Sequence, residues 1–245
     1  MGKFETTGTA AVPTVLPNLE SLRNQNISAQ FTTAQVFNTY LNNSSLDAHM
    51  SKNSEWAAAA YLSQSKYGKY GNSNYSGVEK QVRINNCSNY ITGVGADAQN
   101  ASSSSNTCTT NTYETVKGQT SSTTGNITGI YDMSGGAYEY VMGVYNKTTS
   151  SSGFSTLPDV KYYDNYISTS TTTACNGEIC YGHALGEISE WYSDYADFVN
   201  SSTPWFIRGG GCSGASVSGV FNFDGNLGNA IGTYSFRITL SQAVN

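Results

Sequence analysis

The sequence predicts an α+β protein, with helices near the N-terminus and short strands after them. Apolar residues recur at helical spacing between residues 32 and 62. After residue 70, short runs rich in Tyr, Val and Ile alternate with Gly, Ser, Thr and Asn. The chain has 245 residues, 38% of them hydrophobic, and no internal repeat, so we expect residues 1–245 to form a single domain with a sizeable core.

The N-terminal elements follow in order. Residues 3–7 read as a short strand, and a turn-rich connection containing two prolines follows. Thr32 or Thr33 can cap a first helix, whose apolar positions are Val36, Phe37, Tyr40 and Leu41. Ser51 can cap a second helix, which we expect to run through Glu55, Trp56 and Ala57 to Ala60 as far as Leu62. Its small alanines favour close packing on a sheet.

After residue 70 the only further helical pattern lies around residues 185–195, and we expect short antiparallel strands elsewhere. Two stretches, residues 98–124 and 147–173, consist mostly of Ser, Thr and Asn. This composition suits a disordered linker or a long surface loop. We favour long polar loops, because a cysteine lies in or near each stretch.

Charge and hydropathy exclude several partners. Only 12% of the residues are charged, and the formal net charge is −5 without any Lys/Arg cluster, so nucleic acid is not an expected partner. No apolar run approaches the roughly 18 residues of a membrane span, and Met1-Gly2-Lys3 leads into no signal peptide. The uncharged polar composition is typical of extracellular proteins. We therefore expect an exported protein without direct membrane insertion, whose export signal or anchor lies outside this chain.

The five cysteines suggest two local disulfides. Their spacing pairs Cys87 with Cys108 and Cys175 with Cys180, and it leaves Cys212 over. Each pair would close a polar loop, where a cross-link restricts the unfolded chain most. Metal binding competes with this interpretation, but the sequence holds only two histidines and no repeated Cys-x-x-Cys unit.

Five short runs resemble the formylglycine-generating enzyme family and its relatives with a C-type lectin-like fold. In chain order they are Gly-Lys-Phe-Glu-Thr from residue 2, Ser-Glu-Trp-Ala-Ala-Ala-Ala from 54, Gly-Ile-Tyr-Asp-Met-Ser-Gly-Gly-Ala-Tyr-Glu-Tyr from 129, Arg-Gly-Gly from 208, and Ser-Phe-Arg from 235. They span nearly the whole chain. The sequence also resembles the variable proteins of diversity-generating retroelements, which are surface proteins of bacteria and phages. The resemblance implies a C-type lectin-like, formylglycine-generating-enzyme-like domain.

The resemblance does not extend to the family's catalysis. The enzymes use two cysteines after Arg-Gly-Gly to bind copper and activate oxygen, whereas here only Cys212 lies in that segment. A nucleophilic triad would need His49 or His183 as base, and neither accompanies a Gly-x-Ser-x-Gly elbow. We expect a non-enzyme with no cofactor.

Asp132 and Glu139 are the remaining candidates for chemistry. Carboxylates at this spacing can hold calcium or act as an acid/base pair. Glu139 alternates with Tyr138 and Tyr140 on an expected strand, which favours a buried structural acceptor. Gly136 stands where related enzymes commonly have asparagine, and the short signatures of calcium-dependent sugar lectins are absent. We assign no metal ligand, and a structural calcium remains open.

The segment 211–234 is the expected recognition surface. In the retroelement proteins, ligand-binding residues cluster near the C-terminus, and adenine-directed mutation of Asn codons never yields Lys, Glu, Gln, Met or Trp. None of these five occurs from residue 211 to 236. Alternatively, the segment is a glycine-rich turn region with apolar residues in the core. We expect Val220, Phe221 and Phe223 to fix the backbone while these side chains contact the ligand: Cys212, Ser213, Ser216, Val217, Ser218, Asn222, Asp224, Asn226, Leu227, Asn229, Ile231 and Tyr234.

Aromatic residues outside that segment can extend the surface. Trp191, Tyr192, Tyr195 and Trp205 are candidates for a neighbouring aromatic floor, and each also suits the core. The resulting prediction is a non-catalytic ligand-binding domain on a cell or virion, with a protein or glycan on a cell surface as its macromolecular partner. Two alternatives remain open: a structural pilus-tip or tail-fibre domain, and a copper oxidase of the formylglycine-generating type.

Overall fold

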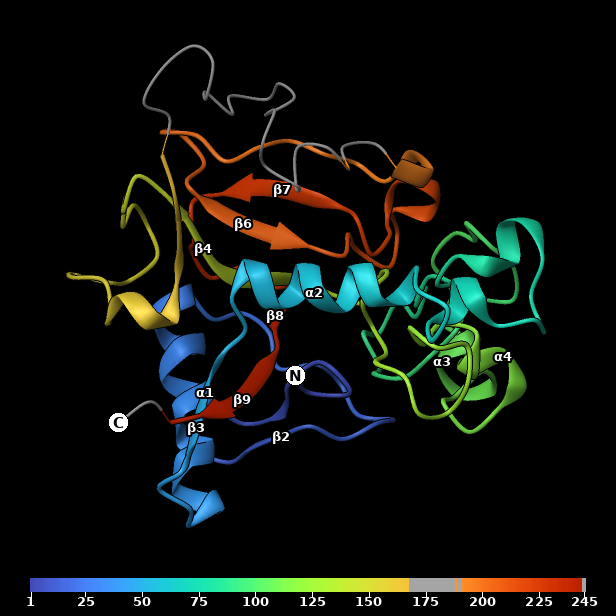
Figure 1. Ribbon diagram of the computed structural model, residues 1–245, viewed down its shortest axis with the longest axis horizontal. Helices are drawn as coiled ribbons and strands as arrows, with labels where there is room; N and C mark the ends of the chain where they lie inside the picture. The colour runs from blue at the N-terminus through green and yellow to red at the C-terminus, as the bar shows by residue number, and fades with distance from the viewer. Residues whose placement is uncertain (168–187, 189–190, 244–245) are drawn as a thin grey trace.

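The computed structural model describes residues 1–167, 188 and 191–243, and these form an α+β structure with few helices and small sheets (Figure 1). The expected class is thereby confirmed. The main sheet has the order β5-β4-β6-β7, and β8 also pairs with β4. Its strands are β4 (Tyr138–Tyr145), β5 (Asp164–Tyr166), β6 (Trp205–Arg208), β7 (Phe223–Asn226) and β8 (Tyr234–Phe236). Two-stranded sheets pair β1 (Thr7–Gly8) with β2 (Pro13–Thr14), and β3 (Leu46–Met50) with β9 (Ile238–Gln242).

The sheet is mixed, so the expectation of antiparallel strands alone was wrong. β4 runs antiparallel to β6 but parallel to both β5 and β8. Parallel neighbours need long connections rather than tight turns. Residues 146–163 connect β4 to β5, and the chain passes through β5, β6 and β7 before β8 pairs with β4.

The first helix, α1 (Ile27–Leu41), begins earlier than expected. Asn26 caps it, because its side-chain oxygen accepts a hydrogen bond of 2.9 Å from the backbone N–H of Ala29. Thr33 is instead buried within the helix. The sequence-based prediction missed this start, although Ile27, Phe31 and Ala34 already lie at helical spacing in the first half and are buried.

The second helix, α2 (Asn53–Ser63), begins two residues after the expected cap. Lys52 occupies the N-cap position, and its backbone N–H donates to a Glu55 carboxylate oxygen at 2.9 Å. Ser51 is buried, with its hydroxyl 2.6 Å from that of Thr239. Trp56 and Ala60 are fully buried, and α2 packs on β4 as its small residues predicted.

The core lies on both faces of the main sheet. Between α2 and the sheet, Trp56 packs with Phe206 and Phe223. On the opposite face, Phe31 of α1 belongs to a cluster with Tyr140. The sheet therefore lies between the two long helices, with α2 in front of it in Figure 1.

Three other expected elements differ from the structure. Residues 3–6 form no strand, although the backbone N–H of Thr6 donates to Phe236 O at 3.0 Å. Of residues 185–195, the described part contains only the 3-10 turn η4 (Trp191–Ser193). Residues 98–124 are not purely a surface loop: they contain α3 (Thr107–Thr110), α4 (Val116–Gln119) and the buried run 120–123. Hydroxyl groups can be buried there because they bond to nearby carbonyls, as Ser121 does to Gly118 O.

Further 3-10 turns are η1 (Lys69–Gly71), η2 (Gly77–Lys80), η3 (Val160–Tyr162) and η5 (Ala215–Val217). Within the predicted loop 147–173, the described part holds η3 and β5. The second expected polar stretch therefore contributes an edge strand as well as loop.

The disulfide between Cys87 and Cys108 is confirmed, and both residues are buried beside Val94. The expected pair Cys175–Cys180 lies outside the described residues. Cys212 is a free, buried thiol. The cross-link closes the first polar loop, as the spacing predicted.

Thiol titration tests both pairings. The chain unfolded without reductant is expected to show one reactive thiol, Cys212, because Cys87–Cys108 and the predicted pair Cys175–Cys180 would engage the other four cysteines. A count of three reactive thiols would contradict the predicted Cys175–Cys180 disulfide, and a count of five would contradict both disulfides. Titration after full reduction, which must give five, is the control.

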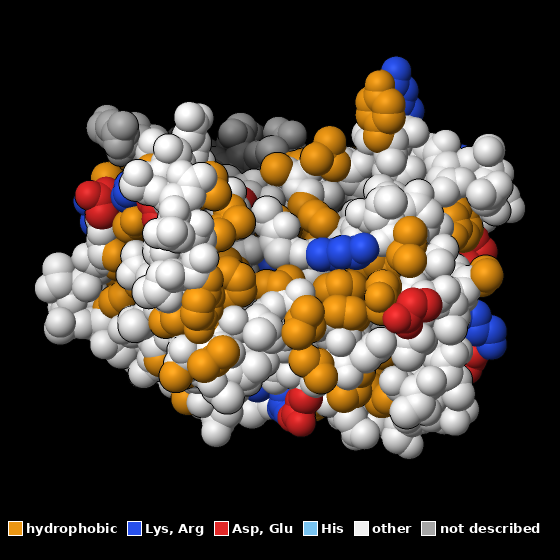
Figure 2. All heavy atoms as spheres, turned by 90° about the horizontal axis from the view of Figure 1, so that it is seen from below, with side chains coloured by type: hydrophobic (Ala, Val, Ile, Leu, Met, Phe, Trp, Pro, Cys, Tyr) orange, Lys and Arg blue, Asp and Glu red, His pale blue; other side chains and the backbone are white. Residues whose placement is uncertain are grey.

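The surface is largely uncharged. In Figure 2, hydrophobic side chains lie among white polar and backbone atoms, with few Lys, Arg, Asp or Glu side chains. Among the described residues, no helix is long and apolar enough to cross a membrane.

Candidate functional site

The predicted recognition segment, residues 211–234, follows β6 directly. The chain leaves the sheet through Gly209 and Gly210, whose φ angles of 83° and 70° suit glycine. It forms a loop containing η5, returns along β7 beside β6, and crosses a second loop to β8. The hydroxyl of Ser218 donates to Gly211 O at 2.8 Å and closes the first loop. The segment thus consists of two loops anchored by two strands.

Most of the predicted contact residues reach the surface. The exposed ones are Ser213, Ser216, Val217 and Leu227, and the half-buried ones are Asp224, Asn226, Asn229, Ile231 and Tyr234. The expected framework residues Val220, Phe221 and Phe223 are buried in the core.

Three predicted contact residues are buried and cannot form part of an exposed surface. Cys212, Ser218 and Asn222 are 5%, 6% and 2% exposed. Ser218 closes the first loop, and the Asn222 amide donates to Val217 O at 2.8 Å. Burial also raises the pKa of the Cys212 thiol. These residues hold the loop in shape, which the sequence hid because short polar side chains suit either role.

The strands bring three of the half-buried candidates, Asp224, Asn226 and Tyr234, onto one face of the main sheet. Tyr138 pairs with Tyr234 across β4 and β8, and their ring centroids lie 5.2 Å apart. On β7, Asp224 pairs with Ile207, whose other neighbour is Tyr140. Alternate residues of a strand share a face, so Asn226 lies on the same side as Asp224.

Asn226 joins the two edges of this face. Its side-chain oxygen accepts a hydrogen bond of 2.6 Å from the Tyr140 hydroxyl, and its amide donates to the Tyr234 hydroxyl at 3.3 Å. It also accepts from the backbone N–H of Gly228 at 3.2 Å. Asn226 is therefore engaged within the protein, and it orients Tyr234 rather than standing free.

Tyr195 lies beside the same face, because its backbone carbonyl accepts a hydrogen bond of 3.0 Å from the N–H of Phe223, the residue before Asp224. The Asp224 carboxylate is the largest cause of the raised pKa of Tyr195, and it also contributes to the raised pKa of Tyr138 and Tyr234, for both of which burial is the largest cause. Tyr195 is 47% exposed, and its backbone N–H donates to Val217 O at 2.9 Å. We call the surface formed by Tyr138, Tyr195, Asp224 and Tyr234 the tyrosine face.

Sequence reasoning missed Tyr138 as a surface residue. Its alternation with the buried Glu139 was the available signal, because neighbours on a strand face opposite sides. Gly211 makes room for it, since a Cβ atom there would lie 2.8 Å from the Tyr138 ring. A side chain at position 211 would displace this tyrosine.

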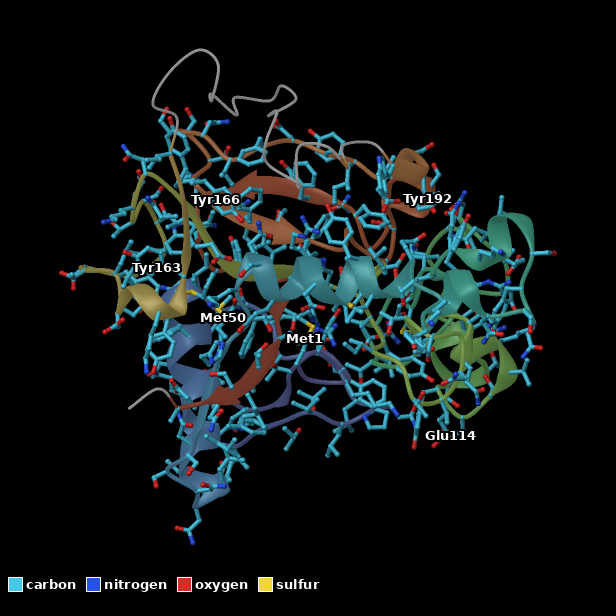
Figure 3. All side chains as sticks on the ribbon, in the orientation of Figure 1. Met1, Met50, Glu114, Tyr163, Tyr166 and Tyr192 are labelled. Carbon is cyan, nitrogen blue, oxygen red and sulfur yellow. A yellow bond between two sulfur atoms is a disulfide. The ribbon has the colours of Figure 1, made fainter. Side chains whose placement is uncertain are left out.

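The residues predicted to form an aromatic floor differ in burial and do not form one surface. Trp205 is fully buried and belongs to the core. Trp191 and Tyr192 are 44% and 39% exposed and pack against Phe221. The Tyr192 hydroxyl donates to the Gln64 side chain at 2.7 Å, just past the end of α2 (Figure 3).

The framework beneath the tyrosine face contains a buried ion pair. Arg237 and Glu139 are both fully buried, and the guanidinium donates through Nη2 at 2.5 Å and through Nε at 3.1 Å to the carboxylate. Glu139 is therefore a buried structural acceptor, as its strand position predicted. Burial is the largest cause of its raised pKa of about 7.

The other acidic candidate, Asp132, is also structural. Its carboxylate accepts hydrogen bonds of 2.8 Å from Asn85 Nδ2 and from the backbone N–H of Gly93. Burial raises its pKa. In the part of the chain that the structure describes, no group of three or more His, Cys, Asp or Glu side chains could hold a metal ion.

Of the two histidines considered as catalytic bases, the structure describes only His49. His49 is 3% exposed and its Nε2 lies 3.0 Å from a Glu55 carboxylate oxygen, which ties β3 to α2. Burial opposes ionisation of Glu55, but hydrogen bonds from His49 and the Lys52 backbone lower the pKa of Glu55 overall. His183 lies outside the described residues.

Comparison with known proteins adds no family assignment. No protein-family model matches the sequence, and no curated protein is significantly similar to it. The site is therefore interpreted from its own geometry.

Proposed function

We propose that this chain is a non-catalytic ligand-binding domain with a C-type lectin-like fold, displayed on a cell or virion. In this proposal it is the variable protein of a diversity-generating retroelement, and the tyrosine face with its two bordering loops is the recognition surface. The ligand is a macromolecule, a protein or glycan on a cell surface.

One observation carries the proposal. A single segment, residues 211–234, supplies buried anchors and outward-facing residues within the same short stretch. Val220, Phe221 and Phe223 fill the core, whereas Ser213, Ser216, Val217 and Leu227 of the two loops are exposed. A rigid scaffold with exposed loops is the usual arrangement of a binding site. Tyrosine is also favoured in recognition surfaces, since its large ring loses little conformational entropy on binding.

The disulfide supports the proposed location. Cys87–Cys108 suits an oxidising, extracellular environment. The buried Cys212 also supports a non-catalytic role, because a thiolate that binds copper or attacks a substrate must be accessible.

Matched substitutions within the segment test the surface. Ser216→Ala removes an exposed hydroxyl and is expected to change the free energy of unfolding by less than about 0.5 kcal/mol. Ser218→Ala removes the buried bond to Gly211 O and is expected to cost about 1–3 kcal/mol. Chemical denaturation measures both. Equal costs of about 1 kcal/mol or more would place Ser216 in the folded framework and contradict the assignment of the loop as recognition surface.

The retroelement origin has a separate test in the neighbouring DNA. It predicts a reverse transcriptase gene and a near-copy of the segment that encodes residues 211 to 236. Absence of both would contradict a variable protein and favour a structural pilus-tip or tail-fibre domain.

A further inference from the structure

We propose that the tyrosine face binds a basic side chain, arginine or lysine, presented by a protein ligand. Asp224 is the counter-ion, and Tyr138, Tyr195 and Tyr234 surround the bound cation. This inference rests on the proposed function and deepens it, because it names the chemical group that the surface recognises.

The charge of the surface is the first argument. Asp224 is the only charged residue between residues 211 and 234. Its carboxylate accepts a hydrogen bond of 2.7 Å from the backbone N–H of Gly225, and among the described residues no Lys, Arg or His side chain forms an ion pair with it. A half-buried carboxylate without a positive partner favours a ligand that supplies one.

The carboxylate of Asp197 adds a second negative charge near Asp224, which further favours a cationic ligand. The backbone N–H of Asp197 donates to Phe223 O at 3.0 Å, which places Asp197 beside the first residue of β7. Burial is the largest cause of the raised pKa of Asp224, and the charge of Asp197 raises it further. A cation bound at Asp224 would relieve this repulsion.

The aromatic rings are the second argument. Tyr138 and Tyr234 lie 5.2 Å apart with their planes inclined by 53°, so the two rings form a corner rather than a flat stack. Tyr195 lies on the Asp224 side, because its backbone carbonyl accepts a hydrogen bond of 3.0 Å from the N–H of Phe223, and its exposed side chain can supply a third ring. The faces of aromatic rings attract cations, and several rings around one position form a cage for an ammonium or guanidinium group.

The basic side chain that borders the second loop, that of Arg23, does not serve as the cation for Asp224. Arg23 borders the second loop by donating to Gly232 O, but its guanidinium pairs with Glu20 and lies 4.1 Å from the Tyr90 ring centroid. The net charge of −5 also favours the approach of a basic ligand. An acidic ligand would instead meet an uncompensated carboxylate.

N-acetyl-arginine amide is a suitable probe, followed by NMR through the backbone amides of Tyr138 and Tyr234. We expect saturable shifts at these amides in the wild-type protein. Asp224→Asn keeps the shape of the side chain, and we expect it to weaken the affinity by roughly three- to tenfold, the range of an exposed or half-exposed charge contact. Asp159→Asn, which changes an exposed carboxylate in a different loop, is the matched control and is expected to leave the affinity unchanged.

The uncharged probe N-acetyl-glutamine amide separates charge from shape, and thermal unfolding of each variant checks its fold. Absence of saturable shifts would overturn the inference. So would an unchanged affinity in Asp224→Asn, or equal shifts with the glutamine probe. Failure here leaves the proposed function standing if Ser216 and Ser218 behave as predicted, whereas equal costs at those two positions would contradict the proposed function whatever the arginine result.

Discussion

Replacement of Arg237 by methionine is expected to lower the free energy of unfolding by about 3–5 kcal/mol, because it leaves the Glu139 carboxylate buried without its counter-ion. The guanidinium also donates to Gly2 O and Tyr131 O, each at 2.9 Å. Those bonds tie the N-terminal segment and the loop before β4 to the junction between β8 and β9, where Arg237 lies. Urea denaturation above pH 7, where the Glu139 carboxylate of the folded protein is ionised, measures the loss.

An exposed ion pair provides the control for this prediction. Lys117 and Asp97 are 57% and 54% exposed, so Lys117→Met is expected to cost no more than about 1 kcal/mol. The double variant Arg237→Met, Glu139→Met removes both buried charges, and we expect it to recover part of the loss. A cost for Arg237→Met as small as that for Lys117→Met would show that the buried pair does not hold the framework together.

The sequence predicted those features that depend on short-range patterns. The alanines of α2 indicated close packing, and the alternation of Tyr138, Glu139 and Tyr140 correctly placed Glu139 inside. Cys87 and Cys108 indicated a local cross-link by their spacing. Each of these signals depends on residues close together in the chain, or on one element and its period.

Features that depend on tertiary position were missed. Ser216 and Ser218 are the same residue type two positions apart, but only Ser218 meets a carbonyl, Gly211 O, across the loop. The start of α1 was missed for a different reason, because its signals, the Asn26 cap and the buried Ile27 and Phe31, are local but the cap was expected later in the chain. Tyr195 joins the tyrosine face from a different loop, where its carbonyl accepts from Phe223 N–H, and no local pattern predicts that pairing. The positions of Ser218 and Tyr195 are set by contacts between residues apart in the sequence, which no local pattern encodes.

Asp194 was also absent from the sequence-based candidates, and it gives the second large expected effect. It is 5% exposed, and its carboxylate accepts a hydrogen bond of 2.9 Å from the backbone N–H of Phe221. Gly219 makes room for it, because a Cβ atom there would lie 2.1 Å from both carboxylate oxygens. Burial raises the pKa of Asp194 to about 7, although the Phe221 hydrogen bond and the charge of Arg208 oppose the change.

This raised pKa predicts that stability falls as the pH rises. Between the ordinary value of 3.8 and about 7, the unfolded chain releases the Asp194 proton while the folded chain keeps it, so deprotonation favours unfolding. Each pH unit across that window costs about 1.4 kcal/mol, and Asp194 alone is expected to contribute a loss of about 2–3 kcal/mol between about pH 5 and pH 7.

Asp194→Asn tests this directly, because asparagine has the same shape, can still accept from the Phe221 N–H and does not titrate. Urea denaturation at several pH values is expected to show a smaller decline for the variant than for the wild type, whereas Asp159→Asn, at an exposed position, should leave the decline unchanged. Both variants should still lose some stability as the pH rises, because burial also raises the pKa values of three other carboxyl groups, those of Glu5, Asp132 and Glu139. If Asp194→Asn follows the wild-type curve, Asp194 is ionised in the folded protein at pH values where burial was expected to keep it neutral, and Arg208 then supplies the compensating charge beneath the recognition surface.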